Sequence, residues 1–413
     1  MSTETVPAAG TYPSPRDARC PYEPPKAYTG GPEQQPVRKM RLWNGDEAWV
    51  VAGYEEGRML LGDPRVSARP DLPGYPHVSP ALAGYRKSGL QTFNNKDNPE
   101  HNVERRMFTK WFTVKRMERL RPRIQDLVDQ AVDRLVAMGS PVDLVEHFAL
   151  PIPSQVIFEL LNAPYRDHEI VEHETHTMLS WRSSAEESRA ASQRLLDYCY
   201  GLIRERAENP RADDVLSLAI SEHVTTGLCT MEQLAEGTRL LFLAGHETTA
   251  NSIAMSVLAL IDHPAQLAAF RDAQDPRQVA LAVDELLRFA TIAQAGRCRV
   301  ALDDIEVGGT TIRAGEGIVV SSEAANWDPR VFERPAELRL DRPNARDHAG
   351  FGHGTHRCIG ETLAEIELQI VLTTLFSRLP DLRVAVPRDQ LRYKTDHTIF
   401  GLYELPVTWG DPK

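Results

Sequence analysis

The chain has 413 residues, of which 42% are hydrophobic and 25% charged, and its formal net charge is −11. This composition is typical of a folded globular protein with a large core, and the acidic balance argues against general binding of nucleic acid. Because no charge-free run of about 18 apolar residues occurs, we expect no membrane span.

The N-terminal residues 1–24 are polar and rich in proline, and they lack the basic start and apolar stretch of a secretory signal. We therefore expect a loosely ordered lead-in, followed by a single domain over residues 25–413. The cysteines are odd in number and widely scattered, which argues against a disulfide framework and predicts a reducing, cytoplasmic compartment. They are Cys20, Cys199, Cys229, Cys298 and Cys358.

Short strands are expected first, at residues 40–42 and 48–51, with a turn at 44–46 between them. Residues 62–96 are rich in Pro, Gly and Asn and predict a long loop. From about residue 100 most of the chain has a helical pattern, interrupted by short strands at 305–307 and 311–312 and by an irregular segment over 326–350. The predicted fold class is therefore mainly α with minor β.

One long helix is expected over residues 231–262, because Thr230 and Gln233 fit a capping box and Pro264 ends the run. At 1.5 Å per residue it would be about 48 Å long. Its middle is apolar all round, yet residues 245–249 read Gly-His-Glu-Thr-Thr. One interpretation is a threonine hydroxyl bonded back to the preceding turn, with Glu247 paired elsewhere; the other is a local opening of the helix over a ligand.

The segment 351–360, Phe-Gly-His-Gly-Thr-His-Arg-Cys-Ile-Gly, precedes a helical run over 361–379 that stops at Pro380. A cysteine at a helix N-terminus meets unpaired backbone N–H groups and the positive end of the helix dipole, which favour the thiolate. His356 and Arg357 add positive charge beside Cys358. The alternative is an ordinary buried cysteine after a glycine-rich turn. A zinc site is excluded because no fourth ligand has a suitable spacing.

These residues match a known family. The pattern Phe351-x-x-Gly354-x-x-x-Cys358-x-Gly360 resembles, in full, the haem-binding signature of cytochromes P450. The run at 244–249 is similar to the family's oxygen-activation motif, and residues 285–288 (Glu-Leu-Leu-Arg) to its E-x-x-R motif. The likeness runs from about residue 20 to residue 409 and is nearest to soluble actinobacterial members. It implies the cytochrome P450 fold, with haem held between the long central helix and the helix after the cysteine loop.

The resemblance implies haem b bound through Cys358, with Ala244, Gly245, Phe351 and Gly360 beside the cofactor and Gly245 leaving room for O2. It implies that four cationic side chains bind the haem propionates: His101 and Arg105 on one helix face, Arg299 and His356. The family's D-P-P-E-H appears here as Asp-Asn-Pro-Glu-His over 97–101, which leaves the assignment of His101 less secure.

The resemblance also assigns Glu247 and Thr248 as an acid–alcohol pair that delivers protons to reduced O2. Glu285 and Arg288 are expected to form a buried cluster with an arginine of the irregular segment, here Arg342. Residues expected to contact a small or medium, mainly apolar substrate are Leu243, Ile292, Gln294, Ile399 and Phe400.

Electrons are expected from NAD(P)H through a reductase and a ferredoxin. The helix after His101 is basic, so it either docks an acidic ferredoxin or is a solvated face. Its cations are Arg105, Arg106, Lys110, Lys115, Arg116, Arg119, Arg121 and Arg123. The histidines at 168, 173 and 176 are interpreted as exposed helix residues rather than metal ligands. We expect a monomer.

The function favoured by these residues is a monooxygenase that inserts one oxygen atom of O2 into its substrate, because the Glu247–Thr248 pair is intact. Two alternatives stay open: another reaction on the same haem, such as nitric oxide reduction, nitration or oxidative coupling, and a haem-binding sensor without catalysis. Product formation with ferredoxin and NADPH would separate the sensor from the enzymes.

Overall fold

The computed structural model describes residues 11–17, 19–29, 35–86, 92–212 and 214–410. It divides into two compact units. The sheet unit comprises Met1–Ser79, Met255–Cys358 and Val386–Tyr403, and the helical unit comprises Pro80–Ala254, Ile359–Ala385 and Glu404–Lys413. Each unit is described by itself.

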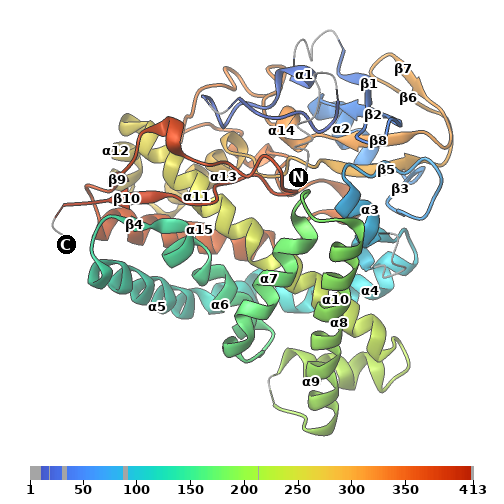
Figure 1. The fold of residues 1–413 in the computed structure, drawn as a ribbon, viewed down its shortest axis with the longest axis horizontal. Coiled ribbons are helices and arrows are strands. Elements are labelled where there is room, and N and C mark those ends of the chain that lie inside the picture. The colour runs from blue at the N-terminus through green and yellow to red at the C-terminus, as the bar shows by residue number, and fades with distance from the viewer. Residues whose placement is uncertain (1–10, 18, 30–34, 87–91, 213, 411–413) are drawn as a thin grey trace. The chain divides into compact units, whose positions relative to one another are not determined.

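The sheet unit contains a five-stranded sheet in the order β1-β2-β8-β5-β3 (Figure 1). The strands are β1 (Val37–Arg41), β2 (Glu47–Val51), β3 (Val66–Ser67), β5 (Arg297–Ala301) and β8 (Gly317–Val320). Strands β2 and β8 pair in parallel, with Trp49 opposite Ile318, and the other pairs are antiparallel. A separate hairpin joins β6 (Ile305–Val307) to β7 (Thr310–Ile312).

Valine and isoleucine side chains form the core of this sheet, as expected for β-branched residues on a half-buried pleated surface. The cluster includes Val51, Ile305, Ile312, Ile318 and Val320. The helices of the unit are α1 (Lys26–Thr29), α2 (Tyr54–Gly62), α12 (Pro264–Asp272), α13 (Pro276–Phe289) and α14 (Ser322–Ala325), with short turns η6 (Ala345–Asp347), η7 (Gly354–His356) and η8 (Arg388–Gln390).

The helical unit is built mainly from helices that pack on one another. They are α3 (Pro80–Arg86), α4 (Glu100–Thr109), α5 (Val114–Met138), α6 (Pro151–Leu160), α7 (His168–Leu179), α8 (Ala185–Glu208), α9 (Val215–Ala219), α10 (Met231–Gly245) and α15 (Glu361–Arg378). The short turns are η1 (Phe93–Asn95), η2 (Lys110–Phe112), η3 (Val145–Ala149), η4 (Tyr165–Asp167) and η5 (Ile220–Val224). Helix α11 (Glu247–Asp262) begins in this unit and continues into the sheet unit. A small sheet pairs β4 (Val142–Asp143), β10 (Pro406–Thr408) and β9 (Arg383–Val384).

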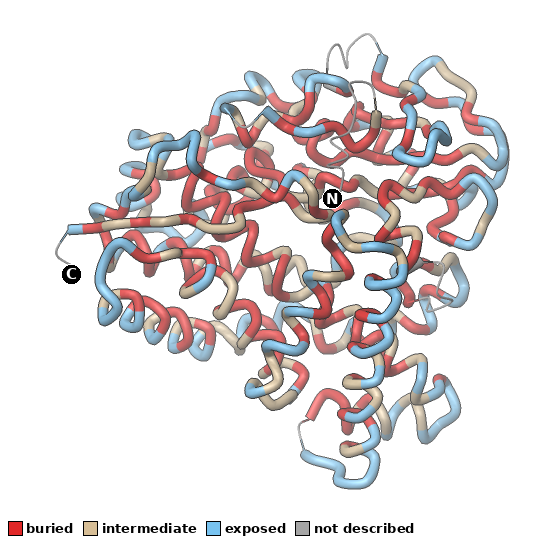
Figure 2. Tube along the Cα trace, in the orientation of Figure 1, coloured by how far each residue is buried: buried red, intermediate tan, exposed pale blue. Residues whose placement is uncertain are grey.

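The longest helix, α5, shows why these segments become helices. Its buried side chains, among them Ile124, Leu127, Val128, Ala131 and Leu135, recur every three or four residues. This spacing places them on one face, which packs against α15. Figure 2 shows the resulting alternation of buried and exposed positions along α5.

Several sequence predictions are confirmed. Thr230 and Gln233 form the expected capping box at the start of α10, and the helix after the cysteine loop ends at Arg378, one residue before its predicted end. The irregular segment over 326–350 contains a single short turn, η6, and the strands expected near residue 305 and residue 311 are present.

Other predictions are wrong. The segment 62–96 contains β3, α3 and η1, so it is not one long loop. The first strand lies at Val37–Arg41, earlier than expected. The basic segment after residue 101 forms two helices, α4 and α5, because η2 and the extended Thr113 separate them. The described part of the N-terminal segment is packed rather than loose, since Tyr12 and Arg16 are buried.

No single helix in the described ranges is long and apolar enough to cross a bilayer. One sharply bent pair of helices, Met231–Asp262 with Pro264–Asp272, has the length and apolar composition of a membrane span. The buried core helices of many folded proteins have the same length and composition.

Candidate active site

Cys358 lies at the end of a glycine-rich loop and is exposed. Its backbone N–H donates to the carbonyl oxygen of Phe351 over 2.9 Å, which closes the loop on itself. Gly352 and Gly354 have φ angles of +77° and +69°, a conformation that glycine adopts without strain. A Cβ at Gly354 would also lie 2.4 Å from the carbonyl oxygen of Leu61 in α2. The loop is therefore held in one shape that leaves the thiol accessible.

Cationic side chains surround this loop within the sheet unit. Arg297, at the start of β5, donates to the carbonyl oxygen of Gly350 over 2.8 Å and to the hydroxyl of Ser322. Burial, with the neighbouring positive charge of Arg299, lowers the pKa of Arg297 to about 10. Burial and three nearby arginines likewise lower the pKa of His348 to about 3. The positive potential behind the loop favours a thiolate at Cys358. Arg297 was not predicted, because nothing in the neighbouring sequence marks this strand residue as a partner of the loop.

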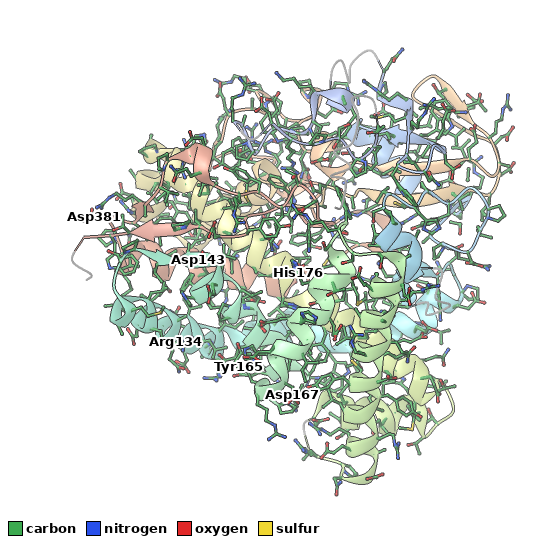
Figure 3. The ribbon with its side chains drawn as sticks, viewed as in Figure 1. Arg134, Asp143, Tyr165, Asp167, His176 and Asp381 are labelled. Carbon is green, nitrogen blue, oxygen red and sulfur yellow. The ribbon has the colours of Figure 1, made fainter. Side chains whose placement is uncertain are left out.

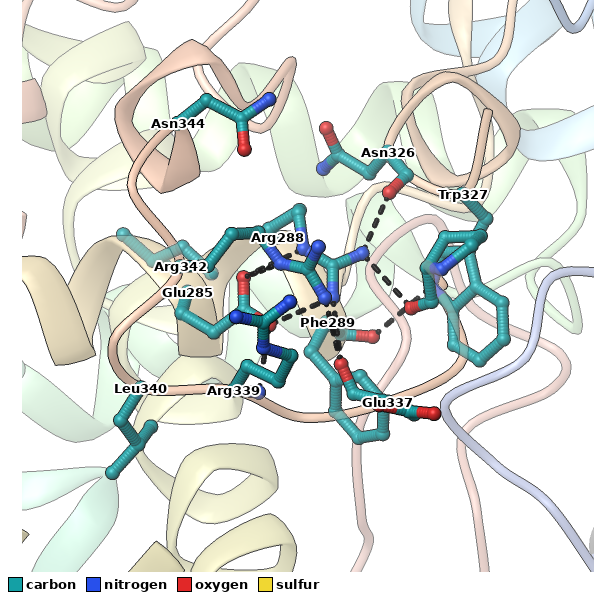
Figure 4. Close-up of polar contacts among 12 residues, drawn as sticks. Glu285, Arg288, Phe289, Asn326, Trp327, Glu337, Arg339, Leu340, Arg342 and Asn344 are labelled. Atoms are coloured by element: carbon teal, nitrogen blue, oxygen red, sulfur yellow. Dashed lines mark hydrogen bonds and ion pairs between the residues drawn. The ribbon is translucent and has the colours of Figure 1, made fainter. Parts of the chain in front are cut away.

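The Glu285 cluster (Glu285, Arg288 and Arg342) is fully buried in the sheet unit (Figure 4). Arg288 donates to both carboxylate oxygens of Glu285, from Nε at 2.7 Å and from Nη2 at 2.9 Å. Arg342 donates from Nε over 2.9 Å, and the backbone N–H of Arg339 completes the set at 3.0 Å. The structure thus brings together the three residues that the motif and the resemblance pointed to.

The two guanidinium groups of the cluster also hold the irregular segment in place. Arg288 donates to the carbonyl oxygens of Asn326 and Pro335, and Arg342 donates to those of Glu333 and Glu337. Irregular backbone has carbonyl groups that no neighbouring strand or helix can satisfy, and these arginines supply the missing donors. The cluster therefore fixes the chain that leads to the cysteine loop.

In the helical unit, the expected long helix is interrupted at His246, which separates α10 from α11. Side chains one turn further along bond the carbonyl oxygens at the break. His246 Nδ1 contacts the carbonyl oxygen of Phe242 at 2.8 Å, Thr248 Oγ1 donates to that of Ala244 at 2.6 Å, and Asn251 donates to that of Glu247 at 2.7 Å. The threonine thus bonds back, as the first interpretation expects, and the helix is also interrupted; that it opens over a ligand stays a prediction.

The polar groups at the break differ in their exposure. Glu247 is buried and its Oε1 lies 3.2 Å from Nδ1 of His176, a half-exposed residue of α7 (Figure 3). Ala244 is exposed and Thr248 is partly exposed, although Leu243, Glu247 and Thr249 are buried. One side of the break is thus accessible while the acid is shielded. The partnership of His176 with Glu247 was not predicted, since 71 residues separate them.

Gly245 has a packing role within the helical unit. A Cβ at this position would lie 2.8 Å from Cγ1 of Ile157 in α6, so the absent side chain allows α10 to approach α6 closely. The expectation that Gly245 leaves room for O2 stays a prediction.

The four predicted propionate ligands are divided between the units. In the helical unit, His101 and Arg105 lie one turn apart on α4, with His101 buried and Arg105 partly buried. In the sheet unit, Arg299 lies on β5 and is buried, while His356 ends η7 and is partly exposed. The i,i+4 spacing on α4 lets both side chains reach toward one ligand edge.

Two of the predicted substrate contacts are engaged elsewhere. The side-chain amide of Gln294 donates to the carbonyl oxygens of Lys394 and His397. The ring of Phe400 is covered by the guanidinium of Arg16 at 4.2 Å and stacks on Tyr393. Both side chains therefore hold protein segments together. Ile292 and Ile399 are partly exposed and stay available for contact, and Leu243 is buried in α10.

Residues 45–402 match the family Cytochrome P450. This chain belongs to the cytochrome P450 family. It is 42% identical over 409 residues to cytochrome P450 CYP105Q4 of Mycobacterium marinum, covering 99% of this chain and 98% of the relative. It is 43% identical over 395 residues to pentalenic acid synthase of Streptomyces avermitilis, with 96% of each protein covered. The crystal structure of mycinamicin VIII C21 methyl hydroxylase from Micromonospora griseorubida, bound to mycinamicin VIII, has a TM-score of 0.89 at 38% identity and covers 97% of this chain and 100% of that one.

Membership of the family establishes the class of chemistry. The protein is a haem-dependent monooxygenase of bacterial type that takes a small-molecule substrate, with O2 as co-substrate and electrons from a reductase and ferredoxin chain. The residues present fit a haem: an accessible thiol on a rigid glycine-containing loop, cations behind it, and the family signature at 351–360.

Proposed function

We propose that this P450 hydroxylates an apolar small molecule and that Cys358 would hold its haem through a thiolate. The accessible thiol on the cationic loop carries this proposal. A thiolate-bound haem, when present, supplies O2 activation and favours O–O cleavage. The protein's task is to keep the sulfur ionised and fixed, and the positive charges of Arg297 and Arg357 and the closed loop would serve that task.

The propionates of the haem would be bound by two pairs of side chains, His101 with Arg105 and Arg299 with His356. Buried carboxylates cost several kcal/mol unless they are paired, so cationic or hydrogen-bonding partners are required for haem retention. Phe351 and Gly360 would help to hold the cofactor beside the thiolate, and Ala244, exposed at the helix break, is a further residue that would contact it.

Protons for O2 reduction would enter through Glu247. Its partly exposed neighbour His176 offers a solvent-side end to the path, and Thr248 offers a site for a bound water. Because the hydrogen of Thr248 Oγ1 is donated to the carbonyl oxygen of Ala244, the hydroxyl oxygen presents its lone pairs as acceptors. In this arrangement Thr248 orients a water, and Glu247 replaces the protons that the water gives up.

The substrate would contact Leu243, Ile292 and Ile399, all of which are apolar. Oxidation of an aliphatic C–H bond is consistent with the name of one relative, a methyl hydroxylase. The direct test is a screen of apolar candidates for a spin-state shift in the absorption spectrum of the purified haem protein. Ligands found in this way should yield hydroxylated products with ferredoxin, reductase and NADPH. A protein whose reduced, carbonyl-bound form lacks the thiolate spectrum would contradict the proposal.

An acidic ferredoxin would dock on the exposed cations Arg106, Lys115 and Arg119 of α4 and α5. Several other cations of the predicted basic face are neutralised within the helical unit: Lys110 pairs with Glu222, Arg121 with Glu118, and Arg123 with Glu159. Because these ion pairs neutralise part of the basic face, the proposed docking surface is limited to Arg106, Lys115 and Arg119.

The docking proposal predicts that Lys115→Glu with Arg119→Glu slows reduction by ferredoxin at low salt and removes its dependence on ionic strength. Arg189→Glu, the same kind of charge change at an exposed position of α8, is the control. Equal rates in the double variant and the control would exclude the surface. We further propose a cytoplasmic monomer, in keeping with the free thiols of Cys20, Cys199, Cys229 and Cys298.

A further inference from the structure

Within the sheet unit, two segments far apart in the sequence are joined into one structure that we call the Ile292–Ile399 wall (residues 291–294 and 397–400). The backbone N–H of Phe400 donates to the carbonyl oxygen of Ile292 over 2.7 Å, and Ala293 forms an antiparallel bridge with Ile399. The side-chain amide of Gln294 also joins the two segments, because it donates to the carbonyl oxygens of Lys394 and His397. Ile292 and Ile399 are the partly exposed side chains of this wall proposed to meet substrate.

The N-terminal segment contacts this wall directly. Arg16 is 6% exposed, and its Nη2 donates to the carbonyl oxygen of Thr291 over 2.5 Å while its guanidinium lies 4.2 Å from the ring centre of Phe400. Tyr12 donates from its hydroxyl to the carbonyl oxygen of Gln294 over 3.2 Å. Arg16 and Tyr12 therefore bond the first and the last residue of the 291–294 segment of the wall.

A buried ion pair fixes Arg16 in this position. Its Nε donates to Oε2 of Glu323 in α14 over 2.9 Å, and both side chains are 1% exposed. Tyr28 donates to the other oxygen of Glu323, and Arg16 also donates to the carbonyl oxygen of Pro21 over 3.1 Å. The N–H donors of the Arg16 guanidinium group are thus distributed over α14, the wall and the N-terminal segment itself.

The energetics favour a positioning role over simple stabilisation. Burying two opposite charges costs desolvation energy that roughly cancels their attraction, so an apolar pair of similar size would hold a core equally well. What an arginine adds is direction, because its planar fork specifies where several acceptors must lie. Here those acceptors include the backbone of the wall.

We propose that Arg16, oriented by Glu323, is a positioning residue that fixes the Ile292–Ile399 wall and thereby selects substrates by shape. This inference rests on the proposed contact of Ile292 and Ile399 with substrate. It assigns Tyr12, Arg16 and Tyr28 to substrate recognition, although they precede the first strand and are not among the side chains proposed to contact substrate.

The experiment uses the haem-loaded protein and two probes that ligate haem iron, imidazole as a small one and clotrimazole as a bulky one. Each is titrated by difference spectroscopy. Arg16→Met alone leaves Glu323 buried without its cation and is expected to lower the yield of folded protein. The combined variant Arg16→Met with Glu323→Gln removes both charges and should restore folding, yet it lacks the bonds to the wall.

In the combined variant we expect the Kd of clotrimazole to rise about tenfold or more and that of imidazole to change by less than about twofold. Hydrogen exchange measured on peptides covering 398–402 should also speed up, because the bond from Phe400 to Ile292 opens more often. Equal changes for both azoles, or unchanged exchange and clotrimazole binding, would overturn the proposal.

A matched control is the buried ion pair of Arg206 and Asp214 in the helical unit, with a 2.9 Å contact and side chains 3% and 0% exposed. Replacing it by Met and Asn should leave the ratio of the two azole affinities unchanged. A third variant, Ile292→Ala, tests the proposed function itself. If it leaves clotrimazole binding unaltered, the wall does not face the ligand and the proposed substrate contacts fail; if it weakens binding while the Arg16 and Glu323 variant does not, only the present inference fails.

Discussion

The buried Glu285 cluster yields a quantitative prediction for Glu285→Gln. The carboxylate accepts four hydrogen bonds, three of them from guanidinium groups, and every side chain of the cluster is at most 1% exposed. The glutamine amide that replaces the carboxylate carries no charge. Its NH2 group would also point its two hydrogens at N–H donors of the arginines, where no hydrogen bond can form. Removing one member of a buried ion pair costs about 3–5 kcal/mol, and we expect the upper part of this range because two arginines lose their partner.

The matched control is Glu337→Gln, the same change at an exposed position of the irregular segment that the cluster holds in place. Glu337 pairs with Arg334 at 3.0 Å, but these side chains are 50% and 57% exposed, so the loss should be about 0–1 kcal/mol. The assay is urea unfolding followed by circular dichroism, together with the ratio of haem to protein after purification. We expect the Glu285 variant to lose both stability and haem. A loss below about 1 kcal/mol, equal to that of the control, would refute the structural role of the cluster.

Further outcomes follow from the site. Cys358→Ser should abolish the thiolate spectrum of the reduced, carbonyl-bound protein, and an unchanged spectrum would rule out this sulfur as the ligand. Thr248→Ala should raise the peroxide formed per NADPH consumed, whereas Thr249→Ala should not; equal coupling in both would count against the assignment. His176→Phe should enlarge the solvent isotope effect on turnover, and an unaltered effect would exclude this residue from the proton path. Burial lowers the pKa of His348 to about 3 in the folded protein. Between about pH 6.5 and 3, therefore, this histidine is protonated in the unfolded chain but not in the folded one. The stability contributed by neutral His348 is thus complete above that window and is lost as the pH falls through it, so His348→Gln should flatten the acid side of the stability profile.

The sequence by itself determined the parts of this protein that depend on neighbouring residues. The cysteine loop, the capping box at Thr230 and the i,i+3 pair of Glu285 with Arg288 are each encoded within a few positions, because backbone geometry fixes how such residues meet. The resemblance to the P450 family was likewise carried by short motifs, and from it followed the haem, the reaction class and the mainly α fold.

Only the tertiary structure decided the contacts between distant segments. Arg16 and Glu323 are 307 residues apart, and His176 and Glu247 are separated by 71, so no local pattern marks either pair. The structure also engaged Phe400 in packing and Gln294 in hydrogen bonds with distant segments, and it gave Gly245 a neighbour in Ile157. The physical reason is common to all of them: a side chain's type states which bonds it can form, whereas its partner is chosen by which surfaces the folded chain brings into contact.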